Sequence, residues 1–499
     1  MWKQIEPTGP HLTYLLLSLF LLTYATFSLF IRNKLHLSEP PLATLLGIIF
    51  GPRVLNVLNP SAWSWGDDVT QEITRVILAV QCFTIGLELP KHYWRRHWRS
   101  AAMLLGPVMA ASWLVCAGFV YALFPVSVAA ALVVAACLTP TDPVLAASVL
   151  GNSEFSQRVP MRLRQLIAAE AGSNDGTSFP FIYIGLSVLT RATVAASLKK
   201  WIVITILWQC GFGIVLGLVI GLASNRILRF AYSRDLVGTE SYLMFYLLLA
   251  LFCVGIASTL GVDDFLLAFS AGLAFSRDGW FPAKTAENVL PSVVDIQLNS
   301  SMFVYFGAVI PWSDFASVNS PEPGFPGLTV GKLFALLILI LLFRRLPFVL
   351  ALKPLIPDIK TWKEAFFAGH FGPMGVGALF LAIEARAQLE TDTSLPLPHP
   401  PMHTPGTPHR LQHPRVVAMI WPLICFVVLG SVLVHGLSPL VISIASQLMK
   451  ERNGDIERQP LIGGSERNGA ERFEGMVWDD DDGLGEEPEG PGLEVNGSI

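Results

Sequence analysis

The chain has 499 residues, of which 52% are hydrophobic and 14% charged, and its formal net charge is −4. Soluble globular proteins have about 25% charged residues, so this composition excludes an ordinary soluble domain. It also leaves no strongly basic surface for a nucleic acid partner. Residues 450–499 contain fourteen acids and five bases interspersed with Gly and Pro, a composition that cannot bury enough apolar area to fold. We therefore predict a transmembrane domain over 1–448 and a disordered acidic tail over 449–499.

Apolar segments follow one another along the predicted membrane domain. A helix needs about 20 largely apolar residues to cross the hydrocarbon core of a bilayer, and the pattern predicts an all-α polytopic membrane protein with about thirteen transmembrane helices. The first segment is longer than the apolar region of a signal peptide and is predicted to be a span. The predicted spans are 11–30, 40–58, 68–89, 101–123, 126–149, 160–189, 202–224, 240–260, 262–277, 291–311, 328–351, 362–384 and 415–447.

Basic residues in the loops predict the orientation, because Lys and Arg accumulate on the cytoplasmic side. With the acidic tail in the cytosol, about seventeen Lys and Arg lie inside and about eight, Arg386 among them, lie outside. An odd number of spans then places the N-terminus outside. The six cysteines occupy apolar runs without a CxxC pair, and the four histidines of the outer loop 388–414 are irregularly spaced among prolines. We therefore predict neither a disulfide framework nor a metal centre in that loop.

The fifth predicted span contains an acid between two prolines. Thr141 and Asp142 lie between Pro140 and Pro143, within a run of Ala, Val and Leu. Each proline removes a helix hydrogen bond, so we expect the helix to open here. Freed carbonyls, the Thr141 hydroxyl and the Asp142 carboxylate are hard oxygen donors that suit a small cation. The alternative is a proline kink in which Asp142 is satisfied by a neighbouring helix.

The sixth predicted span places polar groups in apolar surroundings. Glu170 and Asn174 are four residues apart and share a helical face, with Asp175 adjacent to it. Desolvation favours the neutral form of a buried carboxylate, so Asp175 could hold either a proton or a cation. The alternative is a solvated surface turn.

A pair of arginines ends the apolar run of the eleventh predicted span. A guanidinium at that depth needs a carboxylate, and Glu170 and Asp142 are candidates for Arg344 or Arg345. Alternatively, either arginine extends to the cytosolic surface.

Two further segments have chemical potential. In the twelfth span, Gly372 and Pro373 interrupt the helix, seven spans after the first interruption. An odd offset predicts two inverted repeats whose broken helices cross at the membrane midplane. Asp263 and Asp264 either line an outer funnel that concentrates cations or cap a helix N-terminus.

These segments, taken in order, resemble the monovalent cation/proton antiporter superfamily, and most of all the fungal plasma-membrane Na+/H+ antiporters, over about 37–440. The resemblance implies that Asp175 binds the ion and the proton, with Asn174 as its partner. It also implies that Thr141 and Asp142 lie where unwound helices cross, and that Glu170 pairs with Arg345 or, one position earlier, Arg344. A core domain that moves against a dimerisation domain, usually in a homodimer, is implied as well.

The combined hypothesis is a secondary active transporter and not an enzyme, with no cofactor. Na+ or Li+, with K+ as a further candidate, competes with H+ for Asp175, with Thr141 and Asp142 contributing oxygens. Three alternatives stay open. They are a sodium-coupled symporter for an organic solute, an intramembrane aspartyl protease with Asp142 and Asp175 as its dyad, and a channel.

Overall fold

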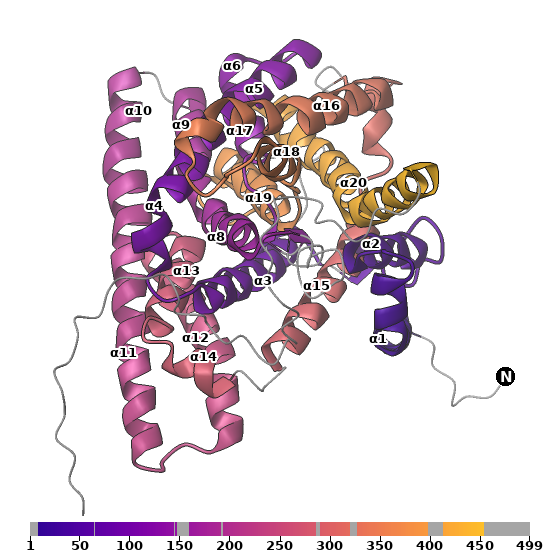
Figure 1. The fold of residues 1–499 in the computed structure, drawn as a ribbon. Coiled ribbons are helices and arrows are strands. Elements are labelled where there is room, and N and C mark those ends of the chain that lie inside the picture. Colours follow the sequence, from indigo (N-terminus) through magenta and orange to yellow (C-terminus); the bar gives the residue numbers. More distant parts are fainter. Residues whose placement is uncertain are drawn as a thin grey trace, which may run out of the picture.

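The computed structural model describes residues 8–63, 65–143, 145–146, 159–190, 193–285, 290–319, 327–397 and 413–453. Within these ranges the regular structure is entirely helical (Figure 1), which confirms the predicted all-α fold. The π-helical segments η2 (Leu104–Val108) and η4 (Trp201–Phe212) join neighbouring helices into longer ones. The α-helices are α1 (Gly9–Asn33), α2 (Glu39–Phe50), α3 (Asp67–Glu88), α4 (Tyr93–Met103), α5 (Met109–Leu123), α6 (Val128–Ala136), α8 (Met161–Thr177), α9 (Phe179–Thr190), α10 (Val194–Lys200), α11 (Gly213–Ser233), α12 (Thr239–Leu260), α13 (Asp264–Phe275), α14 (Trp280–Thr285), α15 (Leu290–Val309), α16 (Val330–Phe343), α17 (Leu346–Leu352), α18 (Trp362–His370), α19 (Val376–Thr391) and α20 (Pro414–Asn453).

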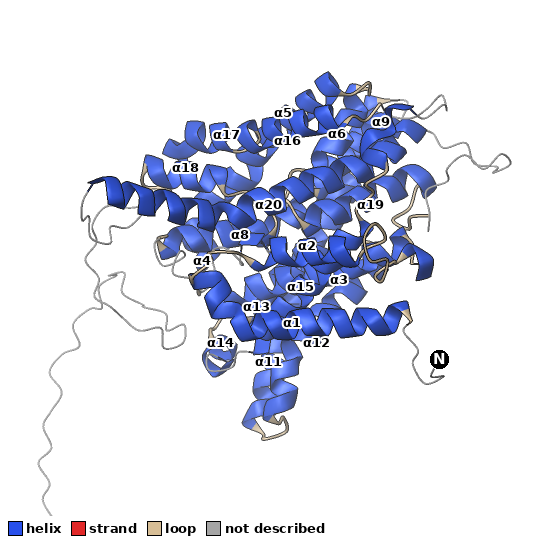
Figure 2. Ribbon diagram, turned by 90° about the vertical axis from the view of Figure 1, so that its right-hand side faces the viewer, coloured by secondary structure: helices blue, strands red, loops and turns tan. Residues whose placement is uncertain are grey.

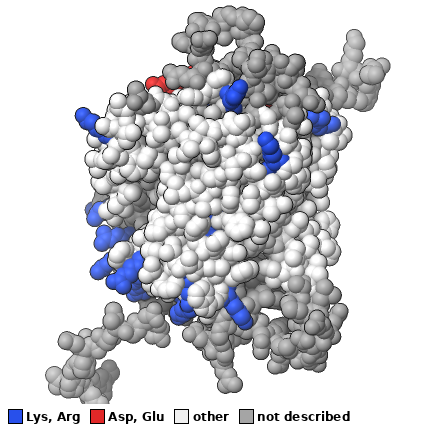
Figure 3. Space-filling view, turned by 90° about the horizontal axis from the view of Figure 1, so that it is seen from above, with Lys and Arg blue, Asp and Glu red and all other residues white. Residues whose placement is uncertain are grey.

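The helices form a bundle with an apolar exterior. Five of those described are long and apolar enough to cross a membrane, namely Gly9–Arg32, Tyr93–Leu123, Val194–Ser233, Val330–Leu355 and Pro414–Ile444. The face shown in Figure 3 is mostly uncharged, and most of its Lys and Arg lie toward the margins. A mostly uncharged surface suits contact with lipid, where charged side chains are costly. That the chain crosses the membrane thirteen times remains a prediction.

Every predicted span coincides at least partly with helix, but several boundaries are wrong. The helix α2 ends at Phe50, eight residues before the predicted end, whereas α10, η4 and α11 form one long helix from Val194 to Ser233 along one side of the bundle (Figure 1). The helix α20 continues to Asn453, past the predicted end of the last span at 447, and the predicted domain boundary at 448 remains a prediction. Residues 454–499 and most of the outer loop, including His399, His403 and His409, lie outside the described residues.

Helix starts follow local capping chemistry. The hydroxyls of Ser127, Thr329 and Thr361 each accept a hydrogen bond from the backbone amide three residues later, at the first turns of α6, α16 and α18. Such caps satisfy amides that have no partner within the helix. The division between α12 and α13 is set by Gly261, whose positive φ of 65° ends α12.

Small residues bring α13 into close contact with its neighbours. A Cβ atom on Gly86 of α3 would overlap the carbonyl of Phe269 in α13, and one on Gly217 or Gly221 of α11 would overlap α13 from another side. Without a hydrophobic driving force in lipid, helices associate through such close backbone packing. The N-terminus of α13 is thereby held against the centre of the bundle, where α3, α8 and α19 also lie (Figures 1 and 2).

Candidate functional site

Two interrupted helices cross at the centre of the molecule. The helix α6 ends at Ala136 and the chain is not helical over 139–142, whereas α18 ends at His370 and α19 begins at Val376. The Asp142 amide donates to the Pro373 carbonyl at 2.7 Å, which joins the two interruptions directly. Pro140 and Gly372 lie within them, and Pro143 begins the following helical turn.

Asp142 compensates the positive ends of two half-helices. One carboxylate oxygen accepts from the Leu145 amide at 3.0 Å, and the other accepts from the Val376 amide at 3.1 Å. The side chain is buried. Free amides at a helix N-terminus carry partial positive charge, so an anion here stabilises both half-helices at once. Both oxygens of Asp142 are therefore engaged by the backbone, although each retains a lone pair for a further ligand.

Arg344 plays the opposite role at the negative ends. Its guanidinium donates to the carbonyls of Leu138 and Gly372, and lies 3.4 and 3.3 Å from those of Thr139 and Pro140. These carbonyls follow the C-terminal ends of α6 and α18, where partial negative charge accumulates. The crossing is thus held by one anion and one cation from the protein itself.

Arg345, the residue after Arg344, forms an ion pair with Glu170. Arg345 contacts both carboxylate oxygens of Glu170, with 2.6 Å between Nη2 and Oε2, and its Nε donates to the Ala368 carbonyl at 2.9 Å. Two parallel N–H···O contacts are the preferred geometry between guanidinium and carboxylate. Both arginines are buried, with exposed fractions of 3% for Arg344 and 6% for Arg345. The alternative in which either extends to the cytosolic surface is therefore wrong, because each has buried acceptors at the break between α16 and α17.

Asp175 is a buried acid whose carboxylate has no hydrogen-bond partner in the part of the chain that the structure describes. Its side chain is 1% exposed, and neither carboxylate oxygen has a hydrogen-bond partner among the described residues. Asn174 donates to the Thr141 hydroxyl at 2.5 Å, and its own carbonyl oxygen is also buried and unpartnered in the described ranges. Buried polar groups are almost always satisfied, so unmatched acceptors at one place indicate a ligand or a proton. The surface-turn alternative for this segment is wrong.

The first turn of α19 lies directly against both carboxylates. A Cβ atom on Gly375 would overlap the carboxylate of Asp142, and one on Gly377 would overlap Oδ1 of Asp175. Glycine is the residue that permits such a close approach of backbone to a polar site. The carboxylates of Asp142 and Asp175 therefore both lie against the start of α19. The hydrogen bond from Asn174 to Thr141 also connects α8 to the interruption after α6.

Comparison with known proteins decides the family. Residues 17–442 match the family model described as sodium/hydrogen exchanger, transmembrane. The chain belongs to this exchanger family. It is 45% identical over 452 residues to Na+/H+ antiporter 2 of Zygosaccharomyces rouxii, covering 90% of this chain and 54% of that protein. It is 38% identical to the Na+/H+ antiporter of Schizosaccharomyces pombe, covering 90% of this chain and 93% of that protein.

The fold agrees with this assignment. The sodium proton antiporter MjNhaP1 of Methanocaldococcus jannaschii superimposes with a TM-score of 0.59 at 17% sequence identity, covering 86% of this chain and 98% of that one. The exchanger-family chain spans about half the length of several curated relatives that it matches, with 54%, 56% and 45% of their lengths covered.

A third buried aspartate lies next to the site of this exchanger-family chain. Asp263 caps α13, since its Oδ1 accepts from the amides of Phe265 and Leu266 at 3.0 and 2.9 Å. Its Oδ2 is unpartnered within the described residues, and a Cβ atom on Gly176, the residue after Asp175, would overlap Asp263 Oδ1. The capping alternative is the one that the structure shows. Asp264 instead pairs with Arg75 at 2.5 Å, so neither acid lines an open funnel.

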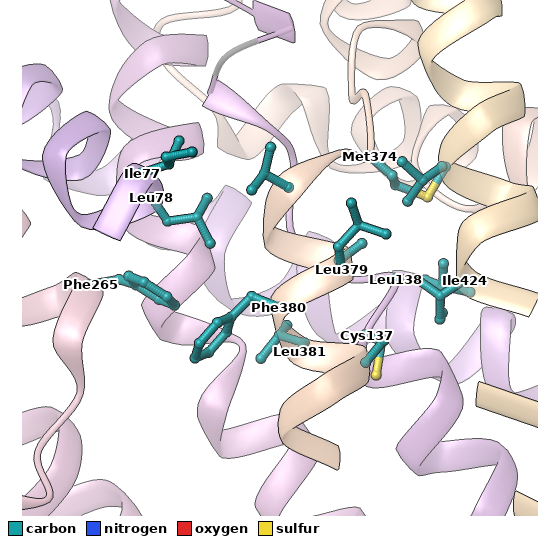
Figure 4. Packing of buried hydrophobic residues seen from close by; sticks show 14 of the residues in the cluster. Ile77, Leu78, Cys137, Leu138, Phe265, Met374, Leu379, Phe380, Leu381 and Ile424 are labelled. Carbon is teal, nitrogen blue, oxygen red and sulfur yellow. The ribbon is translucent and has the colours of Figure 1, made fainter. Parts of the chain in front are cut away.

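Three phenylalanines from different helices pack against one another near the site. The ring centroids of Phe265 and Phe380 are 4.9 Å apart (Figure 4), and Phe179 lies 6.0 and 6.4 Å from them. Arg75 stacks over Phe380 at 5.2 Å. Phe179 is four residues after Asp175, and Phe380 three after Gly377, so the cluster lies one turn from the unpartnered carboxylate.

A polar network beyond these rings was not predicted. Glu384 of α19 accepts from Gln71 of α3 at 2.9 Å and from Tyr183 at 2.8 Å. Arg386 pairs with Asp67 at 2.8 Å. Arg386, which we predicted on the outer side, lies within α19, which continues to Thr391, and its side chain is buried against α3. Its side of the membrane remains a prediction. The sequence signal that could have indicated this network is the group of charged residues at 384, 386 and 390, which follows an apolar run.

Proposed function

We propose that the chain exchanges Na+ for H+ by alternating access, with both ions competing for Asp175. The observation that carries the proposal is the pair of unpartnered oxygens on this buried carboxylate, beside two crossing interrupted helices. Membership of the exchanger family and similarity to proteins named Na+/H+ antiporters support it.

The substrate cation must exchange its hydration shell for protein oxygens. We propose that Asp175 provides the charge, and that Thr141, Asp142 and nearby backbone carbonyls provide further hard oxygens. Asn174 orients Thr141 through its side-chain amide. Arg344 and Glu170–Arg345 hold the helices and do not bind the cation, because their charged atoms are already engaged.

Coupling follows from competition at one site. A protonated Asp175 is neutral and has no charge to stabilise a cation, whereas a deprotonated Asp175 is a buried charge that needs one. The site can therefore reorient with H+ or with Na+ but not empty, and the two gradients set the direction. We propose Li+ as a second substrate, since it too prefers hard oxygen ligands, and K+ as a further candidate.

The contacts between α3 and α19 support a conformation closed at one end. Glu384 with Gln71, Arg386 with Asp67, and the three phenylalanines all lie on the same side of Asp175. By the proposed orientation, with the N-terminus outside and the tail in the cytosol, this is the outer side. A plasma-membrane location and a homodimer are proposed from the resemblance to fungal antiporters.

The alternative of an intramembrane protease needs two free carboxylates that share a water. Both oxygens of Asp142 accept backbone amides instead. This arrangement favours a half-helix cap over a catalytic dyad.

The proposal is tested with purified protein in liposomes that carry a pH gradient and a pH-sensitive dye inside. Adding Na+ should collapse the gradient with the wild-type chain and not with Asp175→Asn. The matched control is Asp278→Asn, which makes the same chemical change at an exposed pair with Arg229 and should transport normally. If a folded Asp175→Asn protein exchanged Na+ for H+ as fast as the wild-type chain, the assignment of Asp175 as the shared binding site would be refuted.

A further inference from the structure

Two side chains of α20 contact the interruption between α18 and α19. The Ser431 hydroxyl oxygen accepts from the Met374 amide at 2.7 Å, and His435 Nε2 lies 3.1 Å from the His370 carbonyl. Both side chains are buried, with exposed fractions of 0% and 3%. They lie four residues apart, so they occupy the same face of α20 on successive turns.

The direction of these hydrogen bonds is determined by their partners. A carbonyl only accepts, so His435 Nε2 carries the hydrogen and donates to His370. An amide only donates, so the Ser431 oxygen is the acceptor for Met374. The other imidazole nitrogen lies 3.2 Å from the Ser431 hydroxyl and 3.0 Å from its carbonyl. One turn of α20 therefore fixes the position where α18 ends and the position just before α19 begins.

The segment between these two points carries the backbone atoms that build the crossing. Arg344 binds the Gly372 carbonyl, and the Asp142 amide binds the Pro373 carbonyl. Val376, two residues after Met374, supplies the amide that Asp142 accepts. Asp175 has no hydrogen-bond partner of its own among the described residues, so its surroundings depend on where this segment lies.

The same part of α20 is also held by the start of α2. Ser38, just before α2, donates to the Gly436 carbonyl at 2.7 Å, and a Cβ atom on Gly436 would overlap Pro41. His435 and Gly436 are adjacent, so α20 is held by α2 while it holds the broken segment. A side chain on a helix that is itself held in place positions the backbone it binds more precisely than a side chain on a loop would.

We propose that Ser431 and His435 are positioning residues that hold 370–374 in the geometry that the cation site requires. This inference rests on the proposed exchange at Asp175 and adds to it a supporting element outside the two crossing helices. Neither residue contacts the cation. Loss of either leaves a buried backbone group without its partner, and the oxygens around the site shift.

The experiment compares Ser431→Ala and His435→Leu with His435→Gln, whose side-chain amide can still donate to the His370 carbonyl. Ser438→Ala is the matched control, because the Ser438 hydroxyl donates within α20 to the Val434 carbonyl at 2.8 Å and, among the described residues, otherwise contacts the side chain and not the backbone of His370. Sodium-dependent exchange is measured in liposomes, and deuterium uptake of 370–376 is measured on the same purified proteins.

We expect the Na+ concentration for half-maximal exchange to rise about tenfold in Ser431→Ala and His435→Leu, with faster deuterium uptake at 370–376. His435→Gln should restore both values, and Ser438→Ala should change neither. Should Ser431→Ala fail to insert, Ser431→Cys serves instead, since sulfur is a weak acceptor.

An unchanged half-maximal Na+ concentration in both disruptive variants would overturn the proposal, even if their yield or thermal stability fell, because that result describes a purely structural role. Unchanged deuterium uptake would overturn it as well. An inactive wild-type chain would instead refute the proposed exchange, and deuterium uptake would then decide the positioning of 370–374 independently.

Discussion

Gly377 lies so close to Asp175 that a Cβ atom at position 377 would overlap Oδ1 of the carboxylate. The contact joins α19, which follows one interrupted helix, to the acid on α8 that has no hydrogen-bond partner in the described residues. The absence of a side chain at one residue therefore sets the space available to a cation at another.

Gly377→Ala should accordingly impair exchange without unfolding the protein. The new methyl group displaces the Asp175 carboxylate, and a misplacement of about 1 Å can cost on the order of a hundredfold in rate. We expect a loss of that order in the exchange rate at low Na+ concentration, measured in liposomes. Gly255→Ala is the control, since nothing lies within 4 Å of a Cβ atom there. Equal rates for the two alanine variants would contradict the assigned geometry.

The same change of Asp to Asn should lower stability at Asp142 but not at Asp175. Asp142 caps two half-helices, so Asp142→Asn puts an amide donor against one of the two backbone amides. We expect it to lower the free energy of unfolding by about 1–3 kcal/mol. Asp175→Asn removes an unpaired buried charge and should leave thermal stability unchanged or raised.

Thermal unfolding in detergent, with and without Na+, separates these roles. A ligand that binds only the native state raises the free energy of unfolding by RT ln(1 + [L]/Kd). Added Na+ should therefore stabilise the wild-type chain and not Asp175→Asn. A sodium-dependent shift that survives in Asp175→Asn would place the cation elsewhere.

The sequence predicted where the helices break better than it predicted which side chains meet there. Prolines at 140, 143 and 373 lack amide hydrogens, so the loss of helix near them is a local property. The partner of Glu170 could not be decided in this way. Arg344 and Arg345 are consecutive, and their directions depend on the break between α16 and α17, which is set by distant carbonyls such as those of Leu138 and Ala368.

Contacts between residues far apart in the chain explain the other omissions. Glu384 is satisfied by Gln71, which is 313 residues away, and Met374 by Ser431, which is 57 residues away. A polar residue within an apolar segment indicates that a partner exists. The identity of that partner follows only from the packing of α3 and α20 against the crossing.

Substitutions of Glu170 and Arg345, which form a buried ion pair, should have non-additive effects on stability. Both side chains are buried, and removal of one leaves the other charged and uncompensated. We expect Glu170→Leu or Arg345→Met to cost about 3–5 kcal/mol, whereas the double variant should cost clearly less than their sum. Thermal unfolding of the four proteins gives the coupling energy. Additive losses would mean that each residue acts through other contacts, such as that of Arg345 with Ala368.

Acidification should weaken the apparent affinity for Na+ without changing the maximal rate. Only deprotonated Asp175 binds the cation in the proposed mechanism, so protons and Na+ compete for one carboxylate. Below the pH at which this acid becomes protonated, each unit of pH lowers the deprotonated fraction about tenfold, and the half-maximal Na+ concentration should rise by the same factor. The measurement is the Na+ dependence of exchange with equal pH on both sides of the liposome membrane, at several pH values, with isotopic Na+ as the tracer. A maximal rate that falls with pH at constant half-maximal concentration would show that protonation acts outside the cation site, and single-site competition at Asp175 would be wrong.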